Sequence, residues 1–282
     1  MKKFRHIYFE LTNICDRKCS FCPEVTRQRM FMPKEDAFRY LEQVAELTEA
    51  IYWHLQGEPL LHPEFQSITE YAHELGLKLK LTTNASHLKD FAEYLLSGRF
   101  SQINFSLQSL NEVSREERER VRLDIAEFSK LALVKCPELY LNFRWWQDAP
   151  PELDFFAEQF GIPKEQWLPS VGRRNRRVIG RLYTNFDGQF EWPDPEKPQR
   201  ENGGKGSCYG LIDHCGILCD GWVVPCCLDS HGSLALGNLH ENSLKEILSS
   251  PTARKMEDGF RRNCRIMKQC QSCGYASRFD IS

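Results

Sequence analysis

Apolar and polar residues follow two alternating patterns over the first two thirds of the chain. Strand-like runs rich in β-branched and aromatic residues lie at 5–12, 51–56, 77–83, 103–109 and 139–146, with a shorter run at 167–171. Segments with apolar residues at helical spacing lie at 34–50, 65–75, 86–97, 116–133 and 151–160. This alternation predicts an α/β fold of parallel strands joined by crossover helices, as an open sheet or a partial barrel. In either fold the ligand site lies at the carboxyl ends of the strands.

The last third of the chain has a different pattern. Residues 184–207 are rich in proline, glycine and charge without helical periodicity, which predicts a linker or a long loop. Two short apolar runs then flank Asp220-Gly221, a pair typical of hairpin turns. Residues 243–260 read as a helix whose first turn has a capping box of Ser243 and Glu246.

Composition and charge narrow the class of protein. The chain has 282 residues, of which 41% are hydrophobic and 27% charged, and this is enough for one large or two small globular domains. A net charge of −2 favours neither a nucleic-acid partner nor a membrane surface. Because there is no long apolar run and no signal-peptide pattern at the start, we expect a cytoplasmic protein.

Twelve cysteines are unevenly distributed along the chain. Three lie at 15, 19 and 22, Cys136 stands alone, and eight fall between 208 and 273. A disulfide framework is not expected in a reducing compartment. The two clusters therefore predict two metal sites on two modules, and Cys136 is expected to be a small buried hydrophobe.

The first cluster, CDRKCSFCP at residues 15–23, directly follows the first predicted strand. A structural zinc site requires four protein ligands, and a fully ligated [4Fe–4S] cluster also requires four thiolates. Three local thiolates would leave one iron open, as in a catalytic metal site. The alternative is three buried or incidental cysteines.

With Phe21 directly before Cys22, the spacing Cys15-x3-Cys19-x2-Cys22 resembles the C-x3-C-x-aromatic-C motif of the radical S-adenosylmethionine (radical SAM) enzymes. The resemblance implies a partial (β/α)6 TIM-type barrel over residues 1–185. It also implies that S-adenosylmethionine chelates the open iron of a [4Fe–4S] cluster. A reducing flavodoxin or ferredoxin system would drive cleavage to a 5′-deoxyadenosyl radical, which abstracts hydrogen from a substrate C–H bond.

Three further segments resemble cosubstrate-binding segments of that family. The matching residues are Gly57 and Glu58 after the second strand, Asn84 after the third and Ser106 on the fourth. Three neighbours depart from the family pattern, namely Gln56, Ala85 and Gln108. Each match also has a structural explanation, as a turn carboxylate, a helix-entry turn or a strand hydroxyl.

The C-terminal cysteines resemble the auxiliary-cluster modules of the same superfamily, called SPASM when full length and twitch when shortened. The resemblance implies an α+β hairpin-and-helix module over residues 208–282, after a linker at 186–207. Its ligands would be Cys226, Cys270 and Cys273, with Cys208 or Cys215 as the fourth. No cysteine follows Cys273, which favours the shortened module with one [4Fe–4S] cluster over two. A zinc ion on Cys264, Cys270 and Cys273 is the alternative.

Three other features have two interpretations each. Arg144 could reach the cosubstrate carboxylate or an acidic substrate, or could stack outward beside two tryptophans. The five arginines between 173 and 181 form either a solvated face or a clamp for an acidic group. Cys219 or Cys227 could donate a hydrogen atom to a substrate radical, as in epimerases that resemble this family.

The substrate class stays open. The short chain, with no additional N-terminal domain to hold a leader peptide, favours oxidation or rearrangement of a small polar molecule, as in aminocyclitol dehydrogenases. The second hypothesis is crosslinking, thioether formation or epimerisation of a ribosomal peptide or protein. A third, from another class, is a non-catalytic iron–sulfur carrier or zinc protein, which would not bind S-adenosylmethionine.

Overall fold

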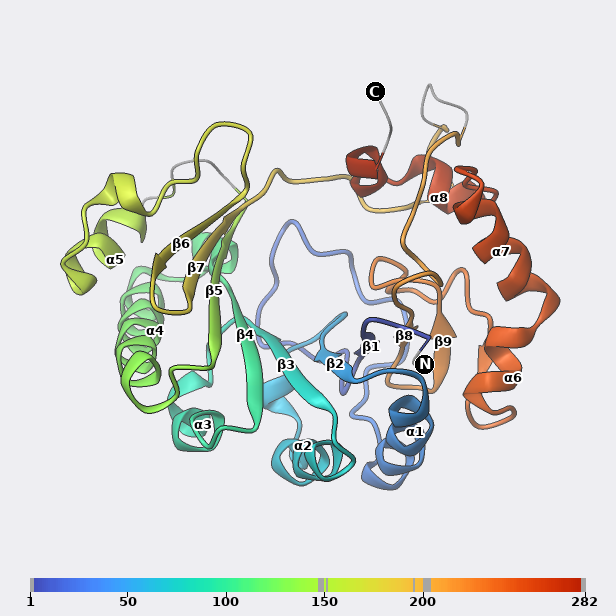
Figure 1. The fold of residues 1–282 in the computed structure, drawn as a ribbon, viewed down its shortest axis with the longest axis horizontal. Helices are drawn as coiled ribbons and strands as arrows, with labels where there is room; N and C mark the ends of the chain where they lie inside the picture. Colours follow the sequence, from blue (N-terminus) through green and yellow to red (C-terminus); the bar gives the residue numbers. More distant parts are fainter. Residues whose placement is uncertain (1–2, 147–149, 151, 195, 200–203, 280–282) are drawn as a thin grey trace.

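A single ten-stranded sheet organises the computed structural model, which describes residues 3–146, 150, 152–194, 196–199 and 204–279. The strand order is β10-β9-β8-β1-β2-β3-β4-β5-β7-β6 (Figure 1). Its centre consists of six strands that pair in parallel: β1 (Ile7–Phe9), β2 (Ala50–Trp53), β3 (Lys78–Thr83), β4 (Phe100–Ser106), β5 (Tyr140–Trp145) and β7 (Leu182–Phe186). The predicted α/β fold of a partial (β/α)6 barrel is therefore confirmed.

Five helices cover one face of these strands (Figure 1). They are α1 (Lys34–Leu47), α2 (Phe65–Glu74), α3 (Leu88–Leu95), α4 (Arg115–Lys135) and α5 (Glu152–Phe160). Each predicted helix is present because its apolar stripe packs on the sheet, as α1 does with Ala37, Tyr40, Leu41 and Val44. Burial of these stripes forms the main hydrophobic core between helices and strands.

The prediction of a strand at 167–171 was wrong. Trp167 is instead fully buried at the end of the short 3₁₀ helix η3 (Lys164–Gln166), where its indole nitrogen donates to the Ile162 carbonyl at 3.2 Å. The sixth parallel strand is β7, which alternates buried and half-buried residues. Part of the arginine-rich run forms β6 (Asn175–Ile179), an antiparallel edge strand beside β7.

The hairpin predicted at Asp220-Gly221 is present. It joins β8 (Gly216–Ile217) to β9 (Trp222–Val224), and Gly221 has a φ of +84°, which favours glycine. The helix predicted over 243–260 is two helices, α6 (Leu244–Ser249) and α7 (Pro251–Arg261), because Pro251 cannot continue α6 and Ser250 caps α7. The capping box of Ser243 and Glu246 is present. A two-residue strand, β10 (Gly237–Asn238), and two short helices, α8 (Lys268–Ser272) and η4 (Tyr275–Phe279), complete the C-terminal part.

The C-terminal hairpin belongs to the same sheet as the barrel strands. Strand β8 pairs in parallel with β1, with Tyr8 opposite Gly216. The cysteine-rich segment is therefore seated directly on the first barrel strand, and the domain boundaries at 185 and 208 stay a prediction. No helix among the described residues is both long and apolar enough to cross a membrane.

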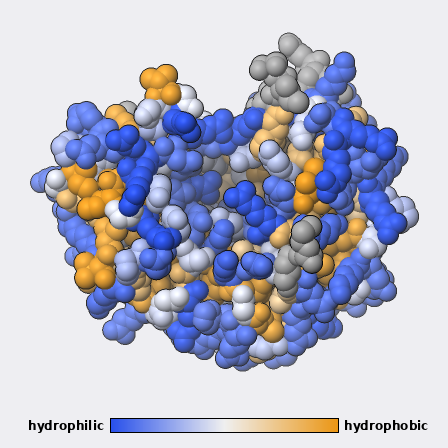
Figure 2. All heavy atoms as spheres, in the orientation of Figure 1, coloured by the Kyte–Doolittle hydropathy of each residue, from blue (hydrophilic) through white to orange (hydrophobic). Residues whose placement is uncertain are grey.

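The inner face of the sheet, opposite the helices, is polar. In register across neighbouring strands lie Tyr52, Lys80 and Gln102, and one level further Thr82, Asn104 and Asn142. The Asn104 side chain bonds to three neighbours: it donates to Thr82 at 3.1 Å and accepts from Gln102 at 2.7 Å and from Asn142 at 3.3 Å. Figure 2 shows hydrophilic residues over the hollowed centre of one face of the molecule. We call the space above the inner face the lumen.

Candidate functional site at the carboxyl ends of the strands

The three-cysteine loop begins directly after β1, at the carboxyl end of that strand. Its last turn is closed by the Cys22 amide, which donates to the Cys19 carbonyl at 3.1 Å, and the two thiols share a hydrogen bond. Burial raises the pKa of Cys15 to about 11. The loop thus gathers the thiols of Cys19 and Cys22 and places them beside the barrel opening.

Arg17, inside the cysteine motif, anchors this loop to the other side of the barrel. Its buried guanidinium donates to the Ser109 hydroxyl after β4 and lies 3.4 Å from the Glu117 carboxylate on α4. The Arg17 amide also approaches the Cys15 sulfur at 3.5 Å. Arg17 cannot be recognised as a site residue from the sequence, because the partners of its side chain lie about a hundred positions away along the chain.

The segment after β2 packs against the base of the cysteine loop. Gly57 has a φ of +70°, and a Cβ atom there would stand 2.3 Å from the Thr12 carbonyl oxygen. The next residue, Glu58, donates its amide to the Ile14 carbonyl at 2.9 Å. Only glycine fits this close backbone approach, which explains the glycine in the predicted Gly57-Glu58 pair.

The Glu58 carboxylate joins the ends of β2 and β3. It accepts from the Thr83 hydroxyl at 2.7 Å, from the Asn84 amide at 2.7 Å and from the Leu60 amide at 3.2 Å. The Asn84 side chain in turn donates to the Cys15 sulfur at 3.6 Å and to Asp16 at 2.9 Å. Glu58, Asn84 and Cys15, which are far apart in sequence, are therefore brought together as the sequence analysis expects for one site.

Burial raises the pKa of Glu58 to about 7 from its usual 4.5. Because the folded state then holds the proton more tightly, the stability due to Glu58 is fully present below pH 4.5 and is lost as pH rises through about 7. Replacing Glu58 by glutamine removes this titration. We expect the free energy of unfolding of the wild type, relative to Glu58→Gln, to fall by roughly 3 kcal/mol between pH 4.5 and 7.5.

Urea denaturation of the cofactor-free protein across that pH range measures this difference. The exposed carboxylate Glu64 offers the control, because Glu64→Gln should show no such fall with rising pH. A wild-type-minus-Glu58→Gln difference that is flat with pH would contradict the assignment.

The remaining predicted cosubstrate residues line the same opening. Ser106 ends β4, and its carbonyl accepts from the Ser109 hydroxyl at 2.7 Å. The side-chain oxygen of Gln108 is buried without a hydrogen-bond partner among the described residues, as expected for an atom that meets a ligand hydroxyl.

Phe21 packs edge-on against Trp146, with ring centroids 4.7 Å apart. Arg144 on β5 lies near His54 and, with burial as the larger cause, lowers the pKa of that histidine to about 3.

A buried ion pair connects the cysteine loop to the C-terminal hairpin. Arg27, on the loop, donates to the Glu10 carboxylate at 2.5 Å, to Asp220 at 3.2 Å and to the Ser230 carbonyl at 2.9 Å. Glu10 also accepts from the Cys219 amide at 3.2 Å. The pairing of Arg27 with Glu10 was not predicted from the sequence, although a glutamate at the end of an apolar strand indicates a buried charge that needs a partner.

Four C-terminal cysteines come together from separate segments. Burial is the main cause that raises the pKa of Cys226, and the neighbouring thiols of Cys227, Cys208 and Cys270 raise it further. Burial also raises the pKa of Cys270, and the thiols of Cys208 and Cys273 raise it further. Cys208, Cys226, Cys270 and Cys273 therefore lie near one another, with Cys227 next to Cys226. We call the first four, which are the ligands that the resemblance implies, the auxiliary cysteine group.

Cys215, the alternative to Cys208, lies elsewhere. It is fully buried within the hydrophobic core beside β1, and burial raises its pKa to about 12. Cys264, required by the zinc alternative, is exposed. Of the two predicted alternatives for the fourth ligand, Cys208 lies beside Cys226 and Cys270, whereas Cys215 lies in the hydrophobic core.

The two predicted hydrogen donors have different surroundings. Cys219 is buried against Glu10 and Arg27, whose guanidinium lies 3.7 Å from its sulfur. Cys227 shares a hydrogen bond with Tyr8 and lies near Arg144; burial, partly offset by these neighbours, raises its pKa to about 11. Because the Tyr8 ring packs against Tyr52 and His54, Cys227 is the cysteine on the lumen side.

The number of thiols in each cysteine set matches an iron–sulfur cluster. Across the described ranges, no three His, Cys, Asp or Glu side chains surround one point as a metal ion requires. In a [4Fe–4S] cluster each thiolate binds a different iron, so the ligands stand further apart. The residues present therefore fit one cluster with three thiolates at the barrel opening and another with four at the auxiliary cysteine group.

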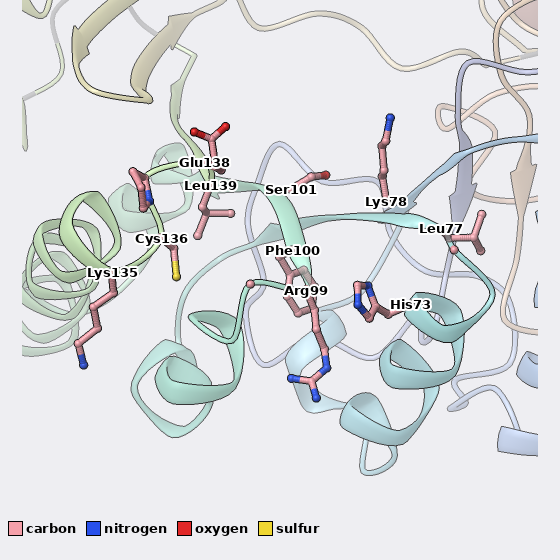
Figure 3. Close-up of a pocket in the computed structure, with 13 residues that line it drawn as sticks. His73, Leu77, Lys78, Arg99, Phe100, Ser101, Lys135, Cys136, Glu138 and Leu139 are labelled. Carbon is pink, nitrogen blue, oxygen red and sulfur yellow. The ribbon is translucent and has the colours of Figure 1, made fainter.

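A separate pocket lies at the opposite, amino-terminal ends of the strands (Figure 3). It has a volume of about 530 Å³, and its lining includes His73, Lys78, Arg99, Cys136 and Glu138. The Cys136 thiol donates to the Leu96 carbonyl at 2.9 Å, so this half-buried cysteine has a local structural partner. The pocket is remote from both cysteine clusters and takes no part in the site.

Family comparisons match both parts of the chain. The model of the radical SAM superfamily matches residues 9–131, and the SPASM model, an iron–sulfur cluster-binding domain, matches residues 208–274. The GTP 3′,8-cyclase of Microcystis aeruginosa is 30% identical in an alignment 290 positions long. The alignment covers 84% of this chain and 85% of that protein. The GTP 3′,8-cyclase of Psychromonas ingrahamii is 28% identical over 116 residues, 39% of this chain and 34% of that protein, so there the chain spans about a third of its relative.

Two solved structures illustrate the shared fold. BtrN in complex with AdoMet and 2-DOIA superimposes with a TM-score of 0.58 at 14% identity, covering 97% of this chain and 94% of that one. SuiB of Streptococcus suis bound to precursor peptide SuiA gives 0.64 at 17% identity, covering 98% and 73%. These identities show the fold alone. The two family matches imply S-adenosylmethionine and [4Fe–4S] clusters as cofactors, and with them a reductant.

Proposed function

This chain belongs to the radical SAM superfamily, and from that premise we propose that it is an enzyme that abstracts hydrogen from a C–H bond of a small polar substrate in the lumen. The observation that carries the proposal is the convergence of Glu58 and Asn84 on Cys15 at the carboxyl ends of three adjacent strands. The bound cofactors supply the 5′-deoxyadenosyl radical, and the protein supplies positioning and exclusion of water.

The chain's own residues have the following roles in this proposal. Cys15, Cys19 and Cys22 hold the first cluster. Glu58, already joined to Asn84, accepts a hydrogen bond from the cosubstrate amine, and Gly57 lets the backbone approach. Phe21, Asn84 and Ser106 make the remaining contacts with the cosubstrate. Arg144 receives a carboxylate, either of the cosubstrate or of an acidic substrate.

The polarity of the inner face supports a small polar substrate. Its central positions carry amides and hydroxyls that already share hydrogen bonds, among them Gln102, Asn104 and Thr82. His54 is half-buried there, and its lowered pKa keeps the ring neutral at pH 7. Such groups recognise hydroxyls, amines and carbonyls rather than an apolar chain. Cys227, on the lumen side beside Tyr8, is the better placed of the two predicted hydrogen donors.

The assay for this function is formation of 5′-deoxyadenosine. Anaerobically reconstituted protein, reduced with dithionite and incubated with S-adenosylmethionine, should release 5′-deoxyadenosine, measured by liquid chromatography with mass detection. Reconstituted protein that contains iron and sulfide but releases none under these conditions would support the non-catalytic carrier instead.

For the auxiliary cysteine group we propose one [4Fe–4S] cluster held by Cys208, Cys226, Cys270 and Cys273. Cys208→Ala should then lower the iron content of the reconstituted protein, from about eight atoms per chain towards about four. Cys215→Ala is the matched control, because that thiol lies in the hydrophobic core and should leave the iron content unchanged. Loss of iron from Cys215→Ala with full retention in Cys208→Ala would reverse the assignment.

A ribosomal peptide or protein is the second candidate substrate, favoured by strand β6. This strand is the last of the sheet, and its residues Asn175, Arg176 and Arg177 are exposed. An exposed edge strand can pair with an added extended segment, and its arginines would attract acidic side chains. SuiB, which shares the fold, has been solved with its precursor peptide bound.

Peptide binding distinguishes the two candidates. If a peptide is the substrate, a fluorescent peptide of alternating glutamate and valine should bind the wild type, and added salt should weaken the binding. The same peptide should fail to bind an Arg176→Glu/Arg177→Glu variant. The same peptide with lysine in place of glutamate is the control. Equal anisotropy with wild type and variant would remove the support for a peptide at β6 and leave the small polar substrate.

A further inference from the structure

Arg265 is a fully buried arginine whose side chain bonds to the backbone directly before Cys208 and three residues after Cys273. We propose that its positive charge stabilises the reduced state of the auxiliary cluster and that its hydrogen bonds position the cluster's ligands. This inference rests on the proposed ligand set of Cys208, Cys226, Cys270 and Cys273.

The side chain of Arg265 joins two of the segments that carry the ligands. Its Nε donates to the carbonyl of Ser207 at 3.2 Å, directly before Cys208. A terminal nitrogen donates to the Ala276 carbonyl at 2.9 Å, and the Ala276 amide itself approaches the Cys273 carbonyl at 3.3 Å. The guanidinium therefore fixes the backbone next to Cys208 and just after Cys273.

The backbone of Arg265 extends the same connection. Its amide donates to the Gly204 carbonyl at 2.8 Å, and its carbonyl accepts from the side chain of Gln271 at 2.8 Å, directly after Cys270. A Cβ atom at Gly204 would stand 2.8 Å from the Arg265 carbonyl oxygen, so the backbone segments at Gly204 and Arg265 are in close contact. One residue thus connects the backbone beside three of the four proposed ligands.

The charge of Arg265 has a direct electrostatic consequence. Its guanidinium is held by the carbonyls of Ser207, directly before Cys208, and of Ala276, three residues after Cys273, so the charge lies close to the auxiliary cluster. A [4Fe–4S] cluster with four thiolate ligands is anionic, and reduction adds a further negative charge inside a region from which water is excluded. Potentials of such clusters depend on nearby charge and on hydrogen bonds. A buried guanidinium therefore makes reduction easier, and its removal should make the potential more negative.

The test uses chains that carry Cys15→Ala, Cys19→Ala and Cys22→Ala, so that only the auxiliary cluster contributes to the spectra. In this background Arg265→Met and Arg265→Lys are compared by iron content and by the midpoint potential from an EPR-monitored redox titration. Arg265→Met should disfavour reduction at least tenfold, a negative shift of at least 59 mV for one electron. Arg265→Lys, which keeps the charge, should shift the potential much less. Arg262→Met, at an exposed arginine paired with Asp258, is the control and should leave the potential unchanged.

The outcomes separate this inference from the proposal beneath it. If the background chain retains no iron, the auxiliary-cluster proposal itself fails. If it retains iron and Arg265→Met has the background potential, the charge role of Arg265 is overturned while the cluster stands. Where Arg265→Met loses its iron, Arg265→Gln, which keeps hydrogen-bond donors without the charge, decides: a negative shift of at least 59 mV supports the inference, and an unchanged potential overturns it.

Discussion

Replacing Cys15, Cys19 and Cys22 together by alanine should abolish 5′-deoxyadenosine formation and lower the iron content from about eight atoms per chain to about four. The three thiols lie on one loop at the carboxyl end of β1. Without them the first cluster has no protein ligands, whereas the auxiliary cysteine group, built from other segments, is unaffected. This is the largest expected effect on activity, because it removes the source of the radical rather than a positioning contact. Iron and sulfide quantification with the deoxyadenosine assay measures both parts.

Cys136→Ala is the matched control for the triple variant. Cys136 lies in the pocket at the amino-terminal ends of the strands, and its thiol donates to the Leu96 carbonyl. Its replacement should change neither the iron content nor the activity. Continued release of 5′-deoxyadenosine by the triple variant would contradict the assignment of the loop. About twelve iron atoms in the wild type would mean two auxiliary clusters instead of one.

Replacing Arg27 by leucine should lower the free energy of unfolding by about 3–5 kcal/mol, the largest expected effect on stability. Glu10 is almost fully buried, and Arg27 is the cation bonded to its carboxylate, at 2.5 Å. Without Arg27 the carboxylate is left buried without that compensation, and the Asp220 and Ser230 contacts are also lost. Urea denaturation of the reconstituted protein, followed by circular dichroism under anaerobic conditions, measures the change.

An exposed ion pair provides the comparison. Arg39 lies 2.8 Å from Asp36 at the surface, and Arg39→Leu should cost less than about 1 kcal/mol. A double variant, Glu10→Gln with Arg27→Leu, should recover part of the loss because the uncompensated charge is removed. Equal destabilisation by Arg27→Leu and Arg39→Leu would show that the buried pair does not hold the cysteine loop to the hairpin.

Local sequence patterns were sufficient to predict most strands and helices of the barrel. The first five strands and their helices follow from side-chain periodicity, since each amphipathic stripe needs only its own segment to be recognised. The sixth strand was missed because Leu182–Phe186 adjoins an arginine-rich run and overlaps the segment predicted as a linker or loop at 184–207. In the strand-like run at 167–171, Trp167 is buried after a 3₁₀ turn, whereas Val171 is exposed. Burial of a large aromatic residue does not by itself distinguish these two conformations.

For the site, motif spacing located the cysteines but not the residues that support them. The choice between Cys208 and Cys215 could not be made from spacing, because it depends on which of them faces the hydrophobic core beside β1. Arg17, Arg27 and Arg265 were missed for a related reason. Each acts through partners that the fold brings from distant parts of the chain, and a single arginine in a sequence does not reveal such partners.

The pairing of β1 with β8 has a consequence for how the protein is made. Tyr8 leaves the ribosome well before its partner strand at Gly216, because about 208 residues separate the two along the chain. Synthesis at about 5–20 residues per second leaves β1 with an unpaired edge for many seconds. Contacts so distant along the chain also form slowly. The edge of β1 is therefore open to mispairing in the nascent chain until the hairpin has emerged.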